Sequence, residues 1–212
     1  MKISLTDAGK RFNREWIFRH LNYTFEEGQS YAIIGPNGSG KSTLLQVLSG
    51  SMMLSEGNVQ FSPPAGRAGM INAQYTIENI YQQVSIGAPY MEVVEEMTLK
   101  EFLDFHHGFK PFLDGLTTDK IISIIALEKA ANKQIRYYSS GMKQRVRLAQ
   151  CIFSDTQIVL LDEPCTNLDA AGIQLYNQLI TDYCKKRMVI VSSNDHHEYE
   201  FCQEKINIIN WK

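Results

Sequence analysis

The sequence predicts an α/β protein with a mostly parallel central sheet, an N-terminal antiparallel β subdomain and a helical region inserted in the core. Three short apolar runs predict buried strands at 31–34, 158–161 and 188–191, because central parallel strands are covered on both faces. Helical patterns lie between these runs, as the alternation of strands and helices in such a sheet requires. In residues 3 to about 29, apolar and polar side chains alternate more, and turn residues are present. This pattern favours an antiparallel edge sheet.

The segment from about 90 to 154 predicts the helical insertion. Thr98 and Glu101 have the spacing of a capping box. Isoleucines at 121–125 suggest a second short helix, although such clusters also suit strands. From Gly141 onward, apolar residues recur at helical spacing. We therefore expect a single domain over 1–212, with an α/β core at 1–89 and 155–212 and a helical subdomain at 90–154.

The composition is that of an ordinary globular protein. Of 212 residues, 44% are hydrophobic, and the formal net charge is -2, so no global field favours nucleic acid or anionic lipid. The four cysteines form no C-x-x-C pair, which argues against zinc and favours a reducing compartment. No run approaches the ~20 apolar residues of a membrane-spanning helix, and the N-terminus lacks a signal peptide's apolar core. We expect a cytoplasmic location, with membrane contact only through another protein.

The segment GPNGSGKST, which begins at Gly35, predicts a phosphate-binding loop between a strand and a helix. Its three glycines let backbone N–H groups approach an anion closely, and the helix that follows adds amides and a dipole. Lys41 can reach the β- and γ-phosphates, and Ser42 can ligate Mg²⁺. The alternative interpretation is a glycine-rich turn without a ligand.

Two carboxylates follow the apolar run that ends at 161. They lie at the carboxyl end of a predicted strand, where ligands bind in open α/β sheets. Asp162 is placed to hold Mg²⁺, directly or through water, and Glu163 to polarise an attacking water. An acidic pair that only caps the next helix is the alternative.

A second anion site is predicted where Tyr138-Ser139-Ser140-Gly141-Met142 opens an amphipathic helix. One chain needs only one phosphate cradle, so a second cradle makes sense if it reaches the nucleotide of a partner chain. An ordinary helix cap at Ser139 or Ser140 is the alternative.

With these motifs in this order, the chain resembles the nucleotide-binding domain of ATP-binding cassette (ABC) transporters over nearly its whole length. GPNGSGKST is similar to Walker A, and IVLLDE to Walker B with its catalytic Glu163. YSSGM is similar to the family signature, usually LSGGQ, and Thr166-Asn167-Leu168-Asp169 to the D-loop. The helical subdomain then lies between Walker A and Walker B. Other phosphate-loop enzymes lack this combination.

The resemblance implies an ATPase that uses ATP and Mg²⁺, drives a separate transmembrane permease and has no nucleic-acid partner. Two copies, or this chain and another ABC ATPase subunit, would form a head-to-tail dimer, with Asp169 acting across the interface. Phe12 would stack on adenine, with Trp16 as the alternative. The implied ATP-binding residues are Phe12, Gly35, Pro36, Asn37, Gly38, Ser39, Gly40, Lys41, Ser42, Thr43 and Asn194. The implied signature contacts to the partner's ATP are Ser139, Ser140, Gly141 and Met142, and the implied metal residues are Ser42 and Asp162.

Three positions depart from the family pattern. The signature reads Ser-Ser-Gly-Met in place of Ser-Gly-Gly-Gln. Pro89 stands at the Q-loop glutamine position, where proline cannot ligate Mg²⁺ or sense the γ-phosphate; Gln82 and Gln83 lie earlier in the chain. Asn194 stands at the switch-histidine position and can donate a hydrogen bond but cannot carry a positive charge.

Three functions are compatible with these residues. The first is the ATPase subunit of a transporter, whose permease contacts a surface near 89–96 that three glutamates would make acidic. The second is a non-transport ABC ATPase acting on ribosomes or DNA, which the single cassette and near-neutral charge oppose. The third is an ATP-gated clamp with weak hydrolysis, which Pro89 and Asn194 favour and Glu163 opposes.

Overall fold

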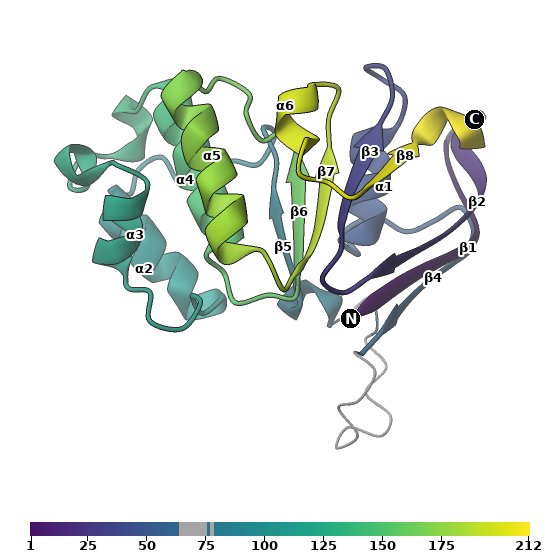
Figure 1. Ribbon diagram of the computed structural model, residues 1–212, viewed down its shortest axis with the longest axis horizontal. Coiled ribbons are helices and arrows are strands. Elements are labelled where there is room, and N and C mark those ends of the chain that lie inside the picture. The colour runs from purple at the N-terminus through teal and green to yellow at the C-terminus, as the bar shows by residue number, and fades with distance from the viewer. Residues whose placement is uncertain (64–75, 77–78) are drawn as a thin grey trace.

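The computed structural model describes residues 1–63, 76 and 79–212, and their strands form two sheets (Figure 1). An antiparallel sheet has the strand order β2-β1-β4, and a parallel sheet has the order β5-β6-β7-β3-β8. The predicted fold class and the three predicted apolar strands are confirmed. The strands are β1 (Lys2–Phe12), β2 (Glu15–Glu26), β3 (Ser30–Ile34), β4 (Glu56–Ser62), β5 (Val84–Gly87), β6 (Ile158–Asp162), β7 (Met188–Ser192) and β8 (Glu204–Asn207).

The helices between β5 and β6 gather at one end of the molecule, and the antiparallel sheet lies at the other end (Figure 1). The α-helices are α1 (Lys41–Leu48), α2 (Leu99–Phe109), α3 (Thr118–Ile124), α4 (Ser140–Ile152), α5 (Ala170–Tyr183) and α6 (His196–Tyr199). The 3₁₀ turns are η1 (Ile80–Gln82), η2 (Glu128–Ala130), η3 (Ile135–Tyr137) and η4 (Ile208–Trp211). The isoleucine cluster at 121–125 therefore belongs mainly to a helix.

The parallel sheet separates two hydrophobic clusters, which explains why its strands read as continuous apolar runs. Along β6, Val159 and Leu161 face the cluster that includes the helical region, while Ile158 and Leu160 face the cluster beneath the antiparallel sheet and α1. Successive side chains of a strand point to opposite faces. Because each face of the sheet is covered, every residue of this strand is buried.

Local side-chain caps fix where two helices of the insertion begin. The Thr98 hydroxyl accepts a hydrogen bond from the Glu101 amide at 3.3 Å, and the Glu101 carboxylate accepts one from the Thr98 amide at 2.8 Å. The bonds that the Thr98 amide and hydroxyl both donate to this carboxylate lower the pKa of the Glu101 carboxyl. The predicted capping box is thus present at α2. At α4, the Ser139 hydroxyl caps the helix by accepting from the Met142 amide at 3.3 Å.

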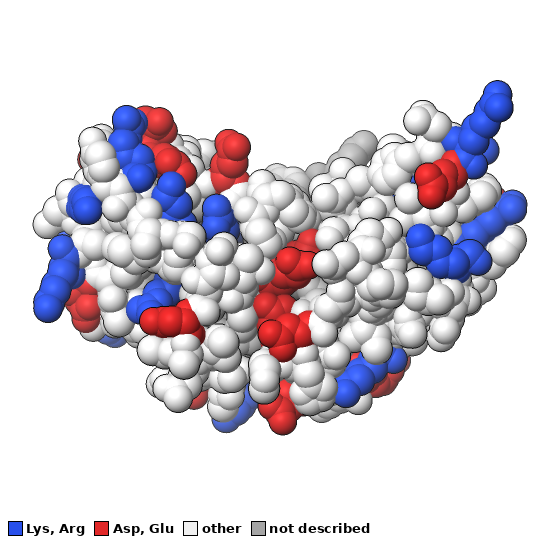
Figure 2. All heavy atoms as spheres, turned by 90° about the horizontal axis from the view of Figure 1, so that it is seen from above, with Lys and Arg blue, Asp and Glu red and all other residues white. Residues whose placement is uncertain are grey.

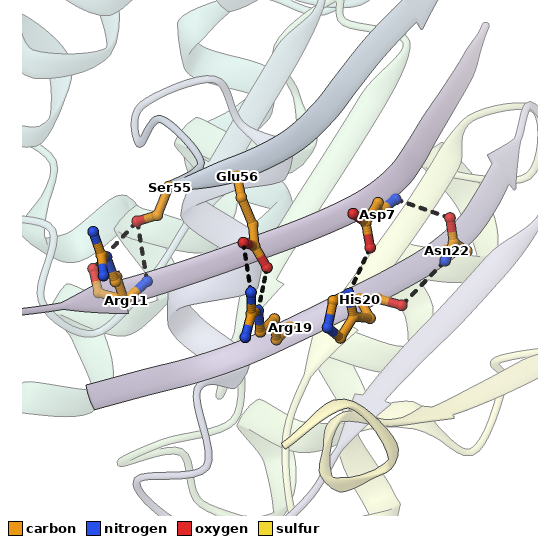
Figure 3. Close-up of polar contacts among 7 residues, drawn as sticks. All are labelled: Asp7, Arg11, Arg19, His20, Asn22, Ser55 and Glu56. Carbon is orange, nitrogen blue, oxygen red and sulfur yellow. Dashed lines mark hydrogen bonds and ion pairs between the residues drawn. The ribbon is translucent and has the colours of Figure 1, made fainter. Parts of the chain in front are cut away.

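Polar side chains on the antiparallel sheet tie its outer strands across β1 (Figure 3). The Arg19 guanidinium on β2 makes two bonds to the Glu56 carboxylate on β4, at 2.5 and 3.1 Å. Gly9 of β1 lies beneath them, and a Cβ there would approach Glu56 Cγ to 2.7 Å. His20 and Asp7 form a second pair at 2.7 Å. The glycine therefore makes room for an ion pair that bridges over the middle strand.

Candidate nucleotide-binding site

The loop between β3 and α1 has a backbone that requires its glycines. Gly38 and Gly40 have φ angles of 74° and 103°, which side-chain-bearing residues rarely adopt. A Cβ on Gly40 would lie 2.3 Å from Cγ2 of Ile17, and one on Gly35 would lie 2.8 Å from Oγ of Ser39. Conformation disfavours side chains at Gly38 and Gly40, and space does so at Gly35 and Gly40, so the loop presents backbone amides.

The first residue of α1 holds a positive charge inside this loop. The Lys41 ammonium donates hydrogen bonds to the carbonyl oxygens of Gly35 at 2.9 Å and Pro36 at 3.3 Å. The Lys41 side chain is buried. These bonds fix the direction of the ammonium, which lies where the loop amides and the N-terminus of α1 favour an anion.

The loop and the carboxyl end of β6 line one pocket. Its volume is about 220 Å³, and it is lined by 37–43, Glu163 and Ile17. The structure therefore brings Glu163 to the predicted phosphate loop, although 120 positions separate it from Thr43 at the end of that loop. Ile17 was not predicted from the sequence. Its only sequence signal is its place in an alternating strand, which does not reveal that β2 runs past the loop.

Glu163 has a strained backbone, with φ at +43°. Left-handed conformations of non-glycine residues cost on the order of 1–3 kcal/mol and tend to persist where the surroundings fix them. The Glu163 amide donates to the Ser192 carbonyl at 2.9 Å, which holds this reversal of the chain at the end of β6. The conformation leaves the carboxyl side chain on the pocket wall.

Three buried oxygens at this edge of the sheet have no hydrogen-bond partner within the described residues. They are Oδ1 of Asp162, Oγ of Ser192 and Oγ of Ser39. Asp162 and Ser192 are cross-strand partners on β6 and β7. Buried polar atoms are nearly always satisfied, so these oxygens fit a hydrated cation. Carboxylate and hydroxyl oxygens are ligand types that Mg²⁺ prefers, and the predicted metal residues Asp162 and Ser42 both lie at this end of the sheet.

Figure 2 looks down on this edge of the sheet, above α6 of Figure 1. Acidic side chains gather in the middle of the face, and basic side chains lie mainly toward its two ends. No broad basic surface therefore surrounds the phosphate loop on this face. Anion binding there would depend on Lys41 and on the local amides.

Asn194 is connected to the phosphate-loop pocket through a residue of the loop, Asn37. Its side-chain amide donates to Oδ1 of Asn37 at 2.6 Å, and Asn37 lines the pocket. His196 and His197 are exposed at the start of α6. The segment after β7 thus presents an uncharged amide, rather than an imidazole, to the phosphate loop.

Neither predicted aromatic residue lines the pocket. Phe12 ends β1 and is 45% exposed, with the Lys10 ammonium 5.2 Å from its ring centroid. The Trp16 ring is contacted by the guanidinium groups of Arg11 and Arg19, at 5.4 and 4.4 Å. The next residue, Ile17, contacts the loop, so Trp16 points to the other face of β2. Stacking of Phe12 on adenine stays a prediction.

The predicted signature and D-loop residues line a different and larger pocket, of about 630 Å³. Gly141 allows the start of α4 to approach the predicted D-loop closely, because a Cβ on Gly141 would lie 2.9 Å from the Asn167 carbonyl oxygen. Arg145 of α4 and Asp169 face each other at 3.5 Å. Asp169 also caps α5. The predicted signature contacts that line this pocket are Ser139, Ser140, Gly141 and Met142.

The segment after β5 carries Pro89 two residues beyond the strand. β5 pairs in parallel with β6, so Pro89 lies at the carboxyl edge of the sheet, near Asp162. Gln82 and Gln83 belong to η1 and its end, before β5 begins. They therefore lie at the amino edge of the sheet and cannot replace a glutamine at position 89.

A groove of about 330 Å³ lies between this segment and α2. Phe105 and Phe109 are exposed on it and contact each other, with ring centroids 5.0 Å apart. His106 also lines the groove, and burial lowers the pKa of its imidazole to about 4, so it is neutral at pH 7. Burial also lowers the pKa of Lys110, whose ammonium donates to the Val84 carbonyl at 2.5 Å.

Two of the three glutamates expected to make the surface near 89–96 acidic are paired with basic side chains. Glu95 forms an ion pair with Lys143 at 2.5 Å, and Glu96 forms one with Arg136 at 3.2 Å. Glu92 is the member of the predicted acidic trio that lines the groove. The groove itself therefore has a mainly apolar lining, with one carboxylate, Glu92, and one amine, Lys110.

A phosphate loop between a parallel strand and a helix, with a strand-end carboxylate facing it, defines the class of phosphate-loop nucleotide-binding proteins. The family model described as ABC transporter matches residues 18–166. The chain is similar to an uncharacterized ABC transporter ATP-binding protein, YhcH, of Bacillus subtilis. The two are 31% identical over 98% of this chain and 66% of that protein.

Two solved structures have the same fold. A putative ABC transporter ATP-binding protein of Pyrococcus furiosus has a TM-score of 0.80, with 19% identity over all of both chains. A dimeric post-hydrolysis state of the ATP-binding cassette MJ0796, bound to ADP and phosphate, has a TM-score of 0.75, with 22% identity over 97% of this chain and 94% of that one. The chain belongs to the ABC transporter family, in which it is an ATP-binding domain.

Within the described residues, no helix is long and apolar enough to cross a membrane.

Proposed function

We propose that this chain is the ATP-hydrolysing subunit of a membrane transporter, and that it pairs around ATP to drive a separate permease. The observation that carries the proposal is the 220 Å³ pocket, in which Glu163 faces the phosphate loop. The loop alone would support nucleotide binding. A strand-end carboxylate on the same pocket adds the group that hydrolysis needs.

The residues of this pocket have distinct tasks in hydrolysis. The loop amides and Lys41 hold the phosphates, and Glu163 orients a water for in-line attack on the γ-phosphate. Ser42 and Asp162 hold Mg²⁺, which when bound offsets the negative charge of the phosphates. Asn194, already bonded to Asn37 of the loop, donates to a γ-phosphate oxygen.

The separation of the two anion sites supports pairing of two subunits. The signature pocket shares none of its lining residues with the phosphate-loop pocket, so one chain carries two distinct sites. Two subunits arranged head to tail would place Ser139–Met142 of one over the nucleotide of the other, with Asp169 at the interface. The partner is a second copy or another ABC ATPase subunit.

The groove beside α2 supports a docking surface for the permease. Phe105 and Phe109 expose 49% and 74% of their surfaces, which is costly in water unless a partner covers them. The neutral His106 adds no charge there at pH 7. We assign an apolar segment of the permease to this groove, which places the chain at the cytoplasmic face of the membrane. The helical subdomain at 90–154 then connects this groove to the signature.

Phosphate release by the purified chain, with ATP and magnesium, tests this function. Steady release that requires both supports an ATPase. A chain that binds ATP but releases no phosphate would instead support the ATP-gated clamp, which Pro89 and Asn194 favour. A chain that does not bind ATP would contradict both functions.

Changing Asn194 to histidine is expected to raise the steady-state ATPase rate about five-fold. An imidazolium donor makes a charge-assisted bond that is about 1 kcal/mol stronger than an amide's bond to the developing charge on the γ-phosphate. The measurement is phosphate release at saturating ATP. The exposed His196, changed to asparagine, is the matched control and should not alter the rate. An unchanged or lower rate in Asn194→His would refute the idea that asparagine slows turnover here.

A further inference from the structure

The peptide unit that joins Pro164 to Cys165, one residue after Glu163, is held at both of its ends. Its carbonyl oxygen, on Pro164, accepts a hydrogen bond from the side-chain amide of Gln144 at 2.8 Å. Its N–H, on Cys165, donates to the carboxylate of Glu198 at 2.6 Å. Because a peptide unit is planar, these two bonds fix its orientation. Side chains from α4 and α6 therefore hold the turn of the chain that follows Glu163.

The orientation of the Gln144 amide depends on Arg147, one turn further along α4. The Arg147 guanidinium donates to Oε1 of Gln144 at 3.3 Å. A guanidinium can only donate and a carbonyl oxygen can only accept, so these two partners place Oε1 on one side and Nε2 on the other. Gln144 is 2% exposed, and a buried amide that loses a partner is costly. Arg147 thus selects the orientation in which the amide donates to the Pro164 carbonyl.

Arg147 also binds the backbone of the segment after β5. Its Nε donates to the Met91 carbonyl at 2.8 Å, and Met91 lines the groove beside α2. One half-buried side chain therefore connects the wall of the groove to the amide that holds the turn after Glu163. The ion pair of Lys143 and Glu95 is a second contact between α4 and the same segment, but it involves neither Arg147 nor Gln144.

We infer that Arg147 is a positioning residue for Glu163, on which it acts through Gln144 and the peptide unit after Pro164. The inference rests on the proposed function, because Glu163 there orients the attacking water. Glu163 has a φ of +43°, and such conformations persist where surrounding contacts hold them. Arg147 supplies one of these contacts indirectly, so the placement of the Glu163 carboxylate depends on the backbone of the groove wall.

The first test compares kcat and KM for ATP in variants of the full chain. Arg147→Met keeps much of the side-chain volume but removes the bonds to Met91 and Gln144. Its kcat should fall about five-fold, which corresponds to about 1 kcal/mol. Its KM for ATP should stay within about two-fold of wild type, because the loop that holds the phosphates is untouched. Lys143→Met, the matched control, breaks only the pair with Glu95 and should keep the wild-type kcat.

A double-mutant cycle separates positioning through Gln144 from a general anchoring of α4. Gln144→Met should lower kcat to a similar extent, and the double variant should lower it no further, because the two side chains act through one contact. A role confined to holding α4 against the segment after β5 would instead give additive effects. An unchanged kcat in Arg147→Met, or an equal fall in Lys143→Met, overturns the inference.

Hydrogen exchange without nucleotide tests the turn independently of hydrolysis. The amides of Cys165, Thr166 and Leu168 are hydrogen-bonded in or beside this turn. In Arg147→Met they should exchange about five-fold faster relative to the amides of β7, whereas a general loss of stability would accelerate both groups equally. An unchanged ratio overturns the inference even if the chain hydrolyses ATP. If the ratio rises but the wild-type chain releases no phosphate, the proposed function fails while the link from Arg147 to the turn stands.

Discussion

Replacing Glu163 by glutamine is expected to lower steady-state ATP hydrolysis by about 10²- to 10⁴-fold, the usual contribution of a positioned general base. The carboxamide has nearly the same shape as the carboxylate, so it can occupy the left-handed conformation at the end of β6. It cannot accept a proton from the attacking water. Phosphate release at saturating ATP and magnesium measures the effect, and ATP affinity should remain within about two-fold of wild type because Lys41 and the loop amides are untouched.

The same change should reveal pairing of the subunits. ATP favours the closed dimer, and hydrolysis of ATP allows that dimer to open. When hydrolysis is blocked, dimers should therefore accumulate. Light scattering coupled to gel filtration should show a doubled mass with ATP and magnesium, and a single mass without ATP. The exposed Glu200, changed to glutamine, is the matched control and should hydrolyse ATP as wild type does. Wild-type hydrolysis in Glu163→Gln would remove Glu163 from the proposed mechanism.

The parts of the fold that could be predicted depend on short-range patterns. β6 and β7 were recognisable because strands covered on both faces are apolar at every position. The start of α2 was recognisable because its capping box lies within four residues. The phosphate loop combines both kinds of signal, since a buried strand leads into a glycine-rich turn and then a helix. Each of these is set by neighbours in the sequence.

The parts that could not be predicted depend on distant pairs. Glu95 and Lys143 are 48 residues apart, so nothing in their spacing indicates that an ion pair offsets part of the acidity near 89–96. Ile17 reaches the phosphate loop only because the antiparallel sheet packs beside α1. Residues at this site whose position depends on packing were therefore missed, while the motif residues were found.

Arg187 is a buried cation whose role no sequence pattern indicated. It precedes β7 and lies at the amino edge of the parallel sheet. Its guanidinium donates to the carbonyl oxygens of Ile152 at 2.6 Å, Thr156 at 2.7 Å and Ser154 at 2.9 Å. It also donates to the Thr156 hydroxyl at 2.6 Å and, more weakly, to the Ser85 hydroxyl at 3.4 Å. One side chain thus ties the end of α4, which begins at the signature, to the strands of the sheet.

Changing Arg187 to methionine is expected to lower the free energy of unfolding by about 3 kcal/mol. Methionine fills much of the same volume but leaves buried carbonyl oxygens without donors, at about 1–3 kcal/mol for each unsatisfied group. Removal of a buried charge offsets part of that loss. For a chain of this length the melting temperature should fall by roughly 6–12 °C. Urea titration and thermal melting followed by circular dichroism measure the two quantities.

The location of Arg187 separates its structural effect from an effect on ATP. The phosphate loop lies at the carboxyl edge of the sheet and Arg187 at the amino edge, so Arg187→Met should still bind ATP at a temperature where it is folded. The neighbouring Lys186 is exposed, and Lys186→Met should change stability by less than about 0.5 kcal/mol. If Arg187→Met were as stable as Lys186→Met, water would have to satisfy the same carbonyl oxygens equally well, and the guanidinium would not be what holds α4 to the sheet.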